Sequence, residues 1–195
     1  MSLLTQKTIK NPVSFQGVGL HSGKIVNVSL KKSDPDTGIV FKRIDLKDNN
    51  LVYPNFMNVT NTSLNTTVEN EFGVKVSTIE HLMGALYGLG IDNAIIEINS
   101  QEVPIMDGSA KKFVESILQA GIQSSEVPIK IIKVEKQIKV IEGDKSISIN
   151  KSNVSLDIEF EIKYKNEFIN SQKNKVSIFE DDLSNIYNSL LSLYH

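Results

Sequence analysis

The sequence predicts an α+β fold made of two units, and three observations carry this prediction. Apolar and polar residues alternate in several short segments before residue 70, which is the period-two pattern of half-buried strands. Two later segments, near residues 77–90 and 109–121, have apolar residues at helical spacing. After a polar stretch, strand patterns resume and end in one more helical pattern. The second unit therefore has fewer elements than the first, and we expect it to be incomplete.

The first strands are expected on either side of a glycine-rich turn. Val26, Val28 and Leu30 alternate with polar residues and predict a half-buried strand. Residues 17–24 (Gly-Val-Gly-Leu-His-Ser-Gly-Lys) separate it from an earlier strand around residues 13–15. The glycine spacing fits neither a dinucleotide fingerprint nor a phosphate-binding loop, so a hairpin turn is the favoured interpretation. Further along, residues 38–42 predict a short strand, and residues 55–70 predict loops and edge strands.

The first predicted helix has a start signal and a stop signal. Ser77 and Glu80 have the spacing of a capping box, which predicts that the helix begins near Ser77. Gly88 and Gly90 are expected to end it. The residues that recur at helical spacing, and that should face the core, are Ile79, Leu82, Leu86 and Leu89.

The second predicted helix follows a strand over residues 94–98 and a turn over residues 104–108. Either Asp107 or Ser109 can cap its beginning, and Gly121 is expected to stop it. Its inward-facing residues are expected to be Phe113, Val114, Ile117 and Leu118.

Residues 123–128 (Gln-Ser-Ser-Glu-Val-Pro) are the favoured linker between the two units. This choice divides the chain into a first domain over residues 1–124 and a second over residues 125–195. In the second domain, strands are expected over residues 129–134, 137–141, 146–149 and 154–162, with a hairpin turn at 142–145. An amphipathic helix should follow, marked by Phe179, Leu183, Ile186, Tyr187, Leu190, Leu191 and Tyr194.

Composition excludes several kinds of protein. The 195 residues contain no cysteine, which excludes a disulfide scaffold, a thiol nucleophile and a cysteine-ligated metal site. A net charge of -2 gives no reason to expect a nucleic-acid partner. With neither a secretory h-region nor an apolar run of about 20 residues, we expect no membrane span and a cytoplasmic location. The histidines are only His21, His81 and His195, and their scarcity matters because a metal site without cysteine normally relies on histidine.

Glu80 and His81 form the sharpest candidate site. On a helix, His81 shares a face with Gly84, Ala85 and Gly88, so small residues leave room beside the imidazole for a ligand or a metal. A carboxylate beside a metal-binding histidine can take a proton from bound water. Pattern alone still favours a capping Glu80 and a packing His81, because no second histidine follows at the spacing used by His-Glu-x-x-His metalloproteases.

Other polar residues have structural interpretations that are at least as good. His21 lies in the glycine-rich turn, where it can stabilise the turn or reach a ligand. For Asp107, a role as a helix cap is favoured over a role as a catalytic carboxylate. The lysine-rich strands of residues 130–145 alternate Lys with Ile and Val, which is typical of a solvated sheet face.

Four motifs occur in order and together resemble a known family. They are residues 17–24, residues 77–82 (Ser-Thr-Ile-Glu-His-Leu), residues 88–93 (Gly-Leu-Gly-Ile-Asp-Asn) and residues 102–110 (Glu-Val-Pro-Ile-Met-Asp-Gly-Ser-Ala). The chain resembles the bacterial zinc-dependent UDP-3-O-acyl-N-acetylglucosamine deacetylases from about residue 6 to about residue 186. This family commits its substrate to lipid A biosynthesis.

The resemblance implies a fold, a reaction and two site residues. The fold has two related domains, each a sheet layered on two helices (ribosomal S5 domain 2-like), with the active site between them. The reaction is zinc-dependent hydrolysis of the N-acetyl group of UDP-3-O-acyl-N-acetylglucosamine, which releases acetate. By matching motif, His81 would be a Zn2+ ligand and Glu80 the general base, and this reverses the preference for their structural interpretation. His21 and Asp107 gain no role.

The chain also departs from the family pattern. The family's other zinc ligands, a histidine and an aspartate, lie in the last third of its chains and have no match here. The pattern continues to Ile186 and is then replaced, and His195 cannot be assumed to substitute for a ligand. Catalytic zinc sites usually have three protein ligands. We therefore expect the 195-residue chain alone to bind zinc weakly, to show no turnover, and to self-associate through its incomplete second domain.

Three hypotheses remain open from the sequence. The chain is a truncated form or fragment of an active deacetylase, or a non-catalytic remnant that binds a nucleotide-sugar lipid or a partner, or one half of a split enzyme. The Glu80–His81 pair favours the first and third hypotheses, because a binding module needs no base beside a metal ligand.

Overall fold

The computed structural model describes residues 4–152, 156–164, 166 and 168–177, and these form two compact units. The first unit extends to residue 129 and the second begins at residue 130. Among the described residues the fold is mixed α and β, with many short strands and the two α-helices α1 and α2, as an α+β fold requires. None of the described helices is long and apolar enough to cross a membrane.

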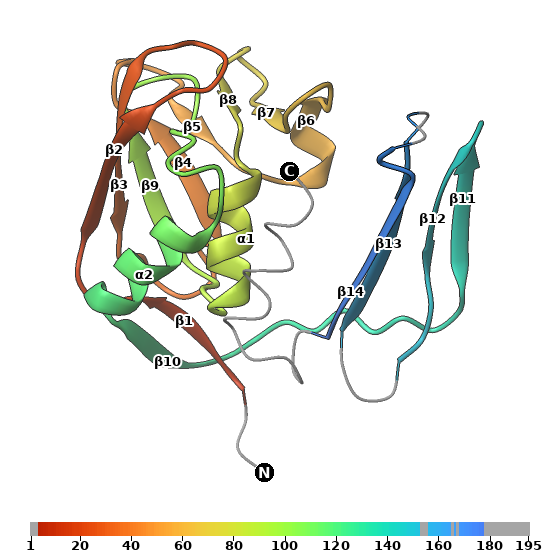
Figure 1. The fold of residues 1–195 in the computed structure, drawn as a ribbon. Coiled ribbons are helices and arrows are strands. Elements are labelled where there is room, and N and C mark those ends of the chain that lie inside the picture. The colour runs from red at the N-terminus through yellow and green to blue at the C-terminus, as the bar shows by residue number, and fades with distance from the viewer. Residues whose placement is uncertain (1–3, 153–155, 165, 167, 178–195) are drawn as a thin grey trace. The chain divides into compact units, whose positions relative to one another are not determined.

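A five-stranded sheet forms the centre of the first unit, with the strand order β2-β3-β9-β4-β5 (Figure 1). The predicted alternation is confirmed in β3, where Val26, Val28 and Leu30 are buried and their neighbours are more exposed. The central strand β9 pairs antiparallel with β3 and parallel with β4. The strands are β2 (Val13–Val18), β3 (Ile25–Lys31), β4 (Ile39–Arg43), β5 (Leu51–Val52) and β9 (Ala94–Ile98).

Helices α1 (Glu80–Gly88) and α2 (Lys111–Ala120) pack side by side against one face of this sheet (Figure 1). The predicted stop signals are confirmed, because Gly90 and Gly121 follow the helices with positive φ angles of 66° and 84°. The core between helices and sheet is almost wholly aliphatic and aromatic. Its fully buried side chains include Leu30, Phe41, Leu82, Leu86, Ile96, Ile98, Phe113 and Ile117.

A second, three-stranded sheet leads directly into α1. It consists of β6 (Val59–Asn61), β7 (Thr67–Glu69) and β8 (Lys75–Ser77), in that order and all antiparallel. A short 3-10 helix, η1 (Phe56–Asn58), precedes it. Residues 55–70, predicted as loops and edge strands, contain η1, β6 and β7, whereas β8 lies outside that region and was not predicted. Since β8 ends three residues before Glu80, its placement decides where α1 begins.

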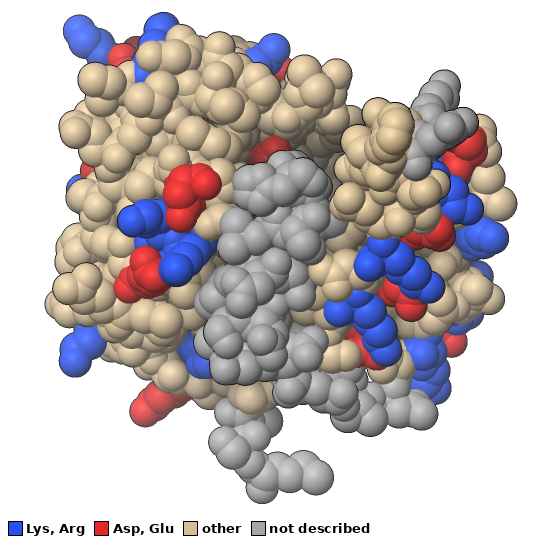
Figure 2. All heavy atoms as spheres, viewed as in Figure 1, with Lys and Arg blue, Asp and Glu red and all other residues tan. Residues whose placement is uncertain are grey.

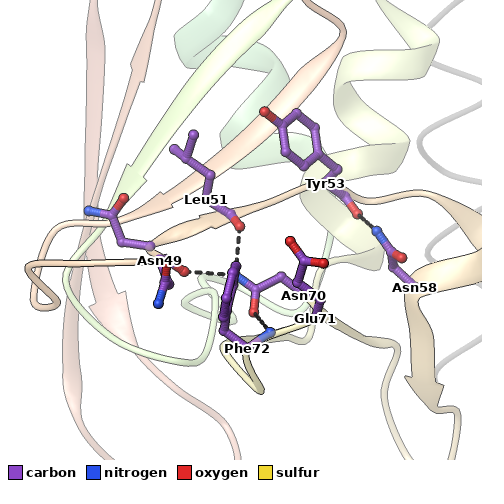
Figure 3. A pocket seen from close by; sticks show the side chains of 8 residues that line it. Asn49, Leu51, Tyr53, Asn58, Asn70, Glu71 and Phe72 are labelled. Atoms are coloured by element: carbon purple, nitrogen blue, oxygen red, sulfur yellow. Dashed lines mark hydrogen bonds between the residues drawn. The ribbon is translucent and has the colours of Figure 1, made fainter.

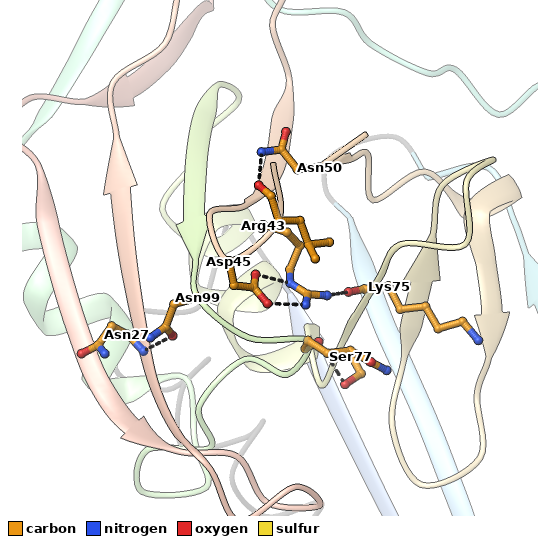
Figure 4. Close-up of polar contacts among 9 residues, drawn as sticks. Asn27, Arg43, Asp45, Asn50, Lys75, Ser77 and Asn99 are labelled. Atoms are coloured by element: carbon orange, nitrogen blue, oxygen red, sulfur yellow. Dashed lines mark hydrogen bonds and ion pairs between the residues drawn. The ribbon is translucent and has the colours of Figure 1, made fainter. Parts of the chain in front are cut away.

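The buried side chain of Arg43 joins the two sheets (Figure 4). Its guanidinium donates two hydrogen bonds to Asp45, of 2.8 Å and 2.6 Å, in the bidentate geometry that suits a carboxylate. A third bond, of 2.8 Å, goes from Nη1 to the carbonyl oxygen of Lys75 in β8. The end of β4 is therefore tied to the strand that precedes the first helix.

This ion pair predicts a specific pH dependence. Hydrogen bonding by Arg43 holds the pKa of Asp45 below its usual value, so the stabilisation is complete above the unfolded pKa of about 3.9. It is lost as the pH falls through the lower pKa of the folded state. We expect the difference in unfolding free energy between the unmodified protein and Asp45→Asn to shrink over that acidic range, measured by urea denaturation. A difference that grows on acidification would contradict this role.

Strand β10 (Ile122–Pro128) corrects the prediction that residues 123–128 are a linker. It pairs antiparallel with β1 (Thr5–Ile9), with Ile9 opposite Ile122 and Thr5 opposite Pro128. In a two-stranded ribbon most outward side chains face solvent, and the polar residues of β10 do so. The segment therefore has the composition of a linker, although its backbone is part of the first unit.

The second unit contains two β-hairpins in its described residues. In the first, β11 (Ile138–Glu142) and β12 (Lys145–Ile149) are joined by a tight turn at Gly143 and Asp144, as predicted. In the second, β13 (Asp157–Lys163) pairs with β14 (Ser171–Ser177). The strand predicted over residues 129–134 is wrong, because the structure assigns no strand to these residues. The helix predicted over residues 179–194 lies outside the described residues.

The two hairpins differ in the faces they expose. On β13 and β14, acidic and basic side chains oppose one another across the strands, as Figure 2 shows, with ion pairs such as Lys173–Glu159 at 2.6 Å. On β11 and β12, Ile138 lies opposite Ile149 and Val140 opposite Ile147, and all four side chains are exposed. The lysine-rich strand is solvated as predicted, but one of its faces is an apolar stripe.

Candidate functional site

The site begins at the junction between β8 and α1, where Glu80 is the first helical residue. The predicted capping box is wrong, since the helix has no side-chain cap and begins at Glu80 rather than near Ser77. Ser77 ends β8 instead, and its backbone N–H donates to the carbonyl oxygen of Gln101 at 2.8 Å. The carboxylate of Glu80 is therefore not needed for capping and is available for another partner.

The partner of the Glu80 carboxylate is the backbone N–H of Thr66, in the connection between β6 and β7. This N–H lies 3.1 Å from Oε1 and 3.3 Å from Oε2, so both oxygens share one donor. The first turn of a helix also favours a negative charge through the helix dipole. The carboxylate is thus oriented by a strand connection 14 residues earlier in the chain and retains lone pairs for a further donor.

His81 is half-buried next to Glu80. Burial lowers the pKa of its imidazole, and the nearby negative charges of Glu80 and Asp107 oppose this shift only in part. The neutral form is therefore favoured near neutral pH, and a neutral imidazole is the form that ligates metals. Asp107 is close enough to affect His81 electrostatically, which its position in the sequence, 26 residues away, does not reveal.

Open space beside this helix face is present as predicted. At Gly84 and Gly88, an added Cβ would meet no atom of the described residues within 4 Å. Ala85, by contrast, is fully buried and belongs to the core. The two glycines therefore leave a bare stretch of helix next to His81, where a ligand can approach the backbone closely.

Glu102 lies at the edge of this region and is nearly inaccessible, with 3% of its surface exposed. Its Oε1 accepts hydrogen bonds from the backbone N–H of His21 at 2.9 Å and from the hydroxyl of Thr78 at 3.1 Å. Its Oε2 accepts from the backbone N–H of Ser22 at 2.8 Å. In the sequence, Glu102 belongs to one of the motifs, but no role was predicted for it. No local pattern indicates hydrogen bonds with residues that are 24 to 81 positions away.

The glycine-rich turn joins β2 to β3 as a hairpin turn, as predicted. Within this turn, the backbone at Gly19 lies very close to other side chains. An added Cβ would lie 2.5 Å from Oε2 of Glu102 and would collide with Oγ of Ser22. The side chain of His21 is exposed on this turn, and its backbone, not its ring, makes the contact with Glu102.

Replacing Gly19 by alanine is therefore expected to lower the free energy of unfolding by about 1–3 kcal/mol, the usual cost of overpacking. Thermal or urea denaturation would measure the change. Gly23→Ala is not a clean control because Gly23 has a positive φ of 65°, whereas Ser14→Ala on the neighbouring strand is expected to change stability by less than about 0.5 kcal/mol. Equal stability of Gly19→Ala and the unmodified protein would contradict the close contact.

Of the two predicted caps of α2, Ser109 contacts the start of the helix, whereas Asp107 binds Ser109 rather than a helical N–H, and Ala110 at the N-cap position makes no side-chain cap. Oδ1 of Asp107 accepts bonds from the backbone N–H and the hydroxyl of Ser109, at 3.2 Å and 2.9 Å. The Ser109 hydroxyl oxygen in turn accepts from the backbone N–H of Lys111, the first residue of α2, at 3.1 Å. Asp107 thus holds the side chain of Ser109, and Ser109 accepts a hydrogen bond from one of the free N–H groups at the start of α2.

A surface pocket of about 510 Å3 lies elsewhere in the first unit (Figure 3). The amide of Asn70 donates to the carbonyl oxygens of Asn49 and Leu51, at 2.7 Å and 2.9 Å, and so holds its rim together. Neither Glu80 nor His81 lines it. Its asparagines are engaged in loop structure, and we assign it no functional role. The lining residues are Asn49, Asn50, Leu51, Tyr53, Asn58, Asn70, Glu71 and Phe72.

The described residues do not form a complete metal site. No group of three or more His, Cys, Asp or Glu side chains that could hold a metal ion exists among them. Of the two described histidines, His81 is half-buried and His21 is exposed. Because catalytic zinc usually needs three protein ligands, the described part of the chain can supply only a share of such a site.

A carboxylate held beside a neutral imidazole at a helix start is the pairing found in metal-assisted hydrolases, where one group takes a proton from water and the other ligates the metal. The sequence profile of the UDP-3-O-acyl N-acetylglycosamine deacetylase family matches residues 6–188. The chain belongs to this family.

Curated relatives agree with this assignment. A UDP-3-O-acyl-N-acetylglucosamine deacetylase of Geotalea uraniireducens is 43% identical over 182 residues, which are 92% of this chain and 59% of the relative. The protein of the same name from Teredinibacter turnerae is 48% identical over 136 residues, 70% of this chain and 45% of the relative. The protein of the same name from Geobacter sp. is 42% identical over 170 residues, which are 87% of this chain and 55% of the relative. The chain thus spans about half the length of the curated relatives it matches.

Proposed function

We propose that this protein hydrolyses the N-acetyl group of UDP-3-O-acyl-N-acetylglucosamine with the help of zinc and releases acetate, a step of lipid A biosynthesis. The observation that carries the proposal is the oriented carboxylate of Glu80 beside the neutral imidazole of His81. The names of the relatives support the substrate. Because the substrate is a nucleotide sugar, a cytoplasmic location forms part of the proposal.

Glu80 is the proposed general base and His81 the proposed zinc ligand. With the Thr66 N–H holding both oxygens, Glu80 can accept a proton from a water molecule as general base. His81, kept neutral by burial, offers a nitrogen lone pair to the metal. Further ligands are required, and the described residues do not supply them. The described part of the chain therefore accounts for the proton transfer at Glu80 and for one metal ligand.

We also propose that both units are related domains of the ribosomal S5 domain 2-like fold, with a boundary close to the one expected at residue 125. The layering of α1 and α2 on a sheet supports this for the first domain. Pairing of β10 with β1 favours a boundary just after Pro128. Self-association is proposed to involve the apolar stripe of Ile138, Val140, Ile147 and Ile149, since exposed apolar patches tend to be covered.

An alternative function is binding without catalysis, by a remnant of the fold that holds a nucleotide-sugar lipid or a partner. One observation favours it: the described residues hold no group of three metal-binding side chains. The orientation of the Glu80 carboxylate argues against it, since binding alone needs no positioned base.

Titration with Zn2+ separates the two functions. We expect the ring signals of His81 in NMR spectra of this chain to shift on addition of Zn2+, and His81→Gln to abolish that shift. In the longest polypeptide that carries this segment and releases acetate, His81→Gln should also abolish acetate release. His21→Gln, which alters an exposed imidazole, is the matched control and should change neither readout. Substrate binding without a zinc response at His81, together with full acetate release by the longer His81→Gln polypeptide, would overturn the proposed role of His81 and support the binding remnant.

A further inference from the structure

Glu102 is a buried carboxylate to which the proposed reaction assigns no task. It accepts hydrogen bonds from the backbone N–H groups of His21 and Ser22 and from the hydroxyl of Thr78. Burial by itself would raise the pKa of this carboxyl, but these bonds, together with the side chain of Ser22, outweigh it and hold the pKa below its usual value. The ionised form, which has acceptors only, is the form that fits these converging donors.

The backbone around Glu102 also connects two elements. The N–H of Val103 donates to the carbonyl oxygen of Ser77 at 3.0 Å, at the end of β8. The N–H of Ile105 donates to the carbonyl oxygen of Val18 at 3.0 Å, at the end of β2. Residues 101–105 therefore lie between the glycine-rich turn and the start of α1, and the Glu102 side chain makes its hydrogen bonds within this junction.

Thr78 is the point at which this junction meets the site. Its φ angle is +56°, a left-handed conformation that is unusual for a β-branched residue and persists only where surrounding contacts impose it. The bond from its hydroxyl to Glu102 is such a contact. Ile79 and then Glu80 follow directly, so the turn at Thr78 sets the direction in which α1 leaves β8.

We propose that Glu102 is a positioning residue for the Glu80–His81 pair, acting through the left-handed turn at Thr78. The same carboxylate also accepts from the backbone N–H groups of His21 and Ser22, so it holds the glycine-rich turn as well as the turn at Thr78. The consequence for the reaction rests on the proposed function, whereas the mechanical link from Glu102 to Glu80 does not. Glutamine cannot replace this carboxylate, because its NH2 group would place a donor against an N–H or O–H donor.

Two variants of Thr78 test the link while leaving Glu102 in place. Thr78→Val has nearly the same shape but lacks the hydroxyl, whereas Thr78→Ser keeps the hydroxyl. We expect Thr78→Val and Glu102→Gln to speed hydrogen exchange at the Thr66 N–H about tenfold, the factor that corresponds to one lost hydrogen bond. Both should also displace the NMR ring signals of His81 at fixed pH. Thr78→Ser should restore both readouts to those of the unmodified protein.

Glu115→Gln, which changes an exposed carboxylate on α2, is the matched control and should leave Thr66 and His81 unchanged. If Thr78→Val and Glu102→Gln lower the melting temperature yet leave the Thr66 exchange and the His81 signals unchanged, Glu102 is structural only and the proposal is overturned. If Glu102→Gln does not fold, the pair of Thr78 variants decides. These readouts need neither zinc nor substrate, so failure of the proposed deacetylation would not be mistaken for failure of this link.

Discussion

Replacing Glu80 by glutamine is expected to lower kcat for acetate release by about 10²–10⁴-fold, the usual contribution of a general base. Glutamine has almost the same shape, and its carbonyl oxygen can still accept the hydrogen bond from the Thr66 N–H. It cannot take a proton from water near neutral pH. The side chain therefore stays in place while the proposed chemical step is lost.

Steady-state kinetics and zinc content, measured on the longest polypeptide that carries this segment and releases acetate, would test this expectation. KM and zinc content should remain within a few-fold of the unmodified protein, because His81 is untouched. Glu115→Gln removes a carboxylate of the same size from the surface of α2 and should leave kcat unchanged. If Glu80→Gln keeps full kcat, another group is the base; if it loses zinc together with activity, Glu80 acts on the metal site.

Replacing Phe113 by alanine is expected to lower the free energy of unfolding by about 3–5 kcal/mol, the range for removing a large aromatic side chain from a core. Phe113 has no exposed surface. Its ring packs edge-to-face on Phe15 of β2, with ring centroids 5.0 Å apart and an angle of 68° between the ring planes. The substitution would leave a cavity between α2 and the sheet.

Urea denaturation followed by far-UV circular dichroism would measure this loss. Gln119→Ala, on the exposed face of the same helix, is the control and should change the free energy of unfolding by less than about 0.5 kcal/mol. A loss below about 1 kcal/mol for Phe113→Ala would mean that the core collapses into the space, or that α2 contributes little to the stability of the first unit.

Local patterns in the sequence predicted the elements that are governed by local forces. The alternation at Val26, Val28 and Leu30 predicted β3, because successive side chains of a strand point to opposite faces. Gly90 and Gly121 predicted helix ends, because residues with positive φ are needed there. Residues 94–98 were predicted as a strand and form β9.

Patterns failed where a distant partner decides the structure. Residues 123–128 have the composition of a linker, yet they form β10 because β1, more than a hundred residues earlier, offers a free edge. Ser77 and Glu80 have the spacing of a capping box, but Gln101 takes the backbone N–H of Ser77 and Thr66 binds the carboxylate of Glu80. In each case a hydrogen bond between segments far apart in sequence replaced a local one.

The candidate site, too, could be predicted only in part from the sequence. Their chemistry and adjacency made Glu80 and His81 a candidate pair, but the pattern alone favoured structural roles, and the family resemblance proposed them as base and zinc ligand. The contacts that position this pair could not be predicted, because Thr66, Thr78 and Glu102 come from three separate segments of the chain. A buried carboxylate is stabilised by whichever donors the fold places next to it, and no rule of sequence spacing predicts which residues these are.

By itself, then, the sequence determined the α+β class and most helices and strands of the first unit, because periodicity is a local property, whereas the roles of Glu80 and His81 were proposed from the family resemblance. Only the tertiary structure decided the strand order β2-β3-β9-β4-β5, the pairing of β10 with β1 and the anchoring of the α1 start by Glu102. These features depend on satisfying buried backbone and carboxylate groups across long separations in the chain, which requires the complete fold.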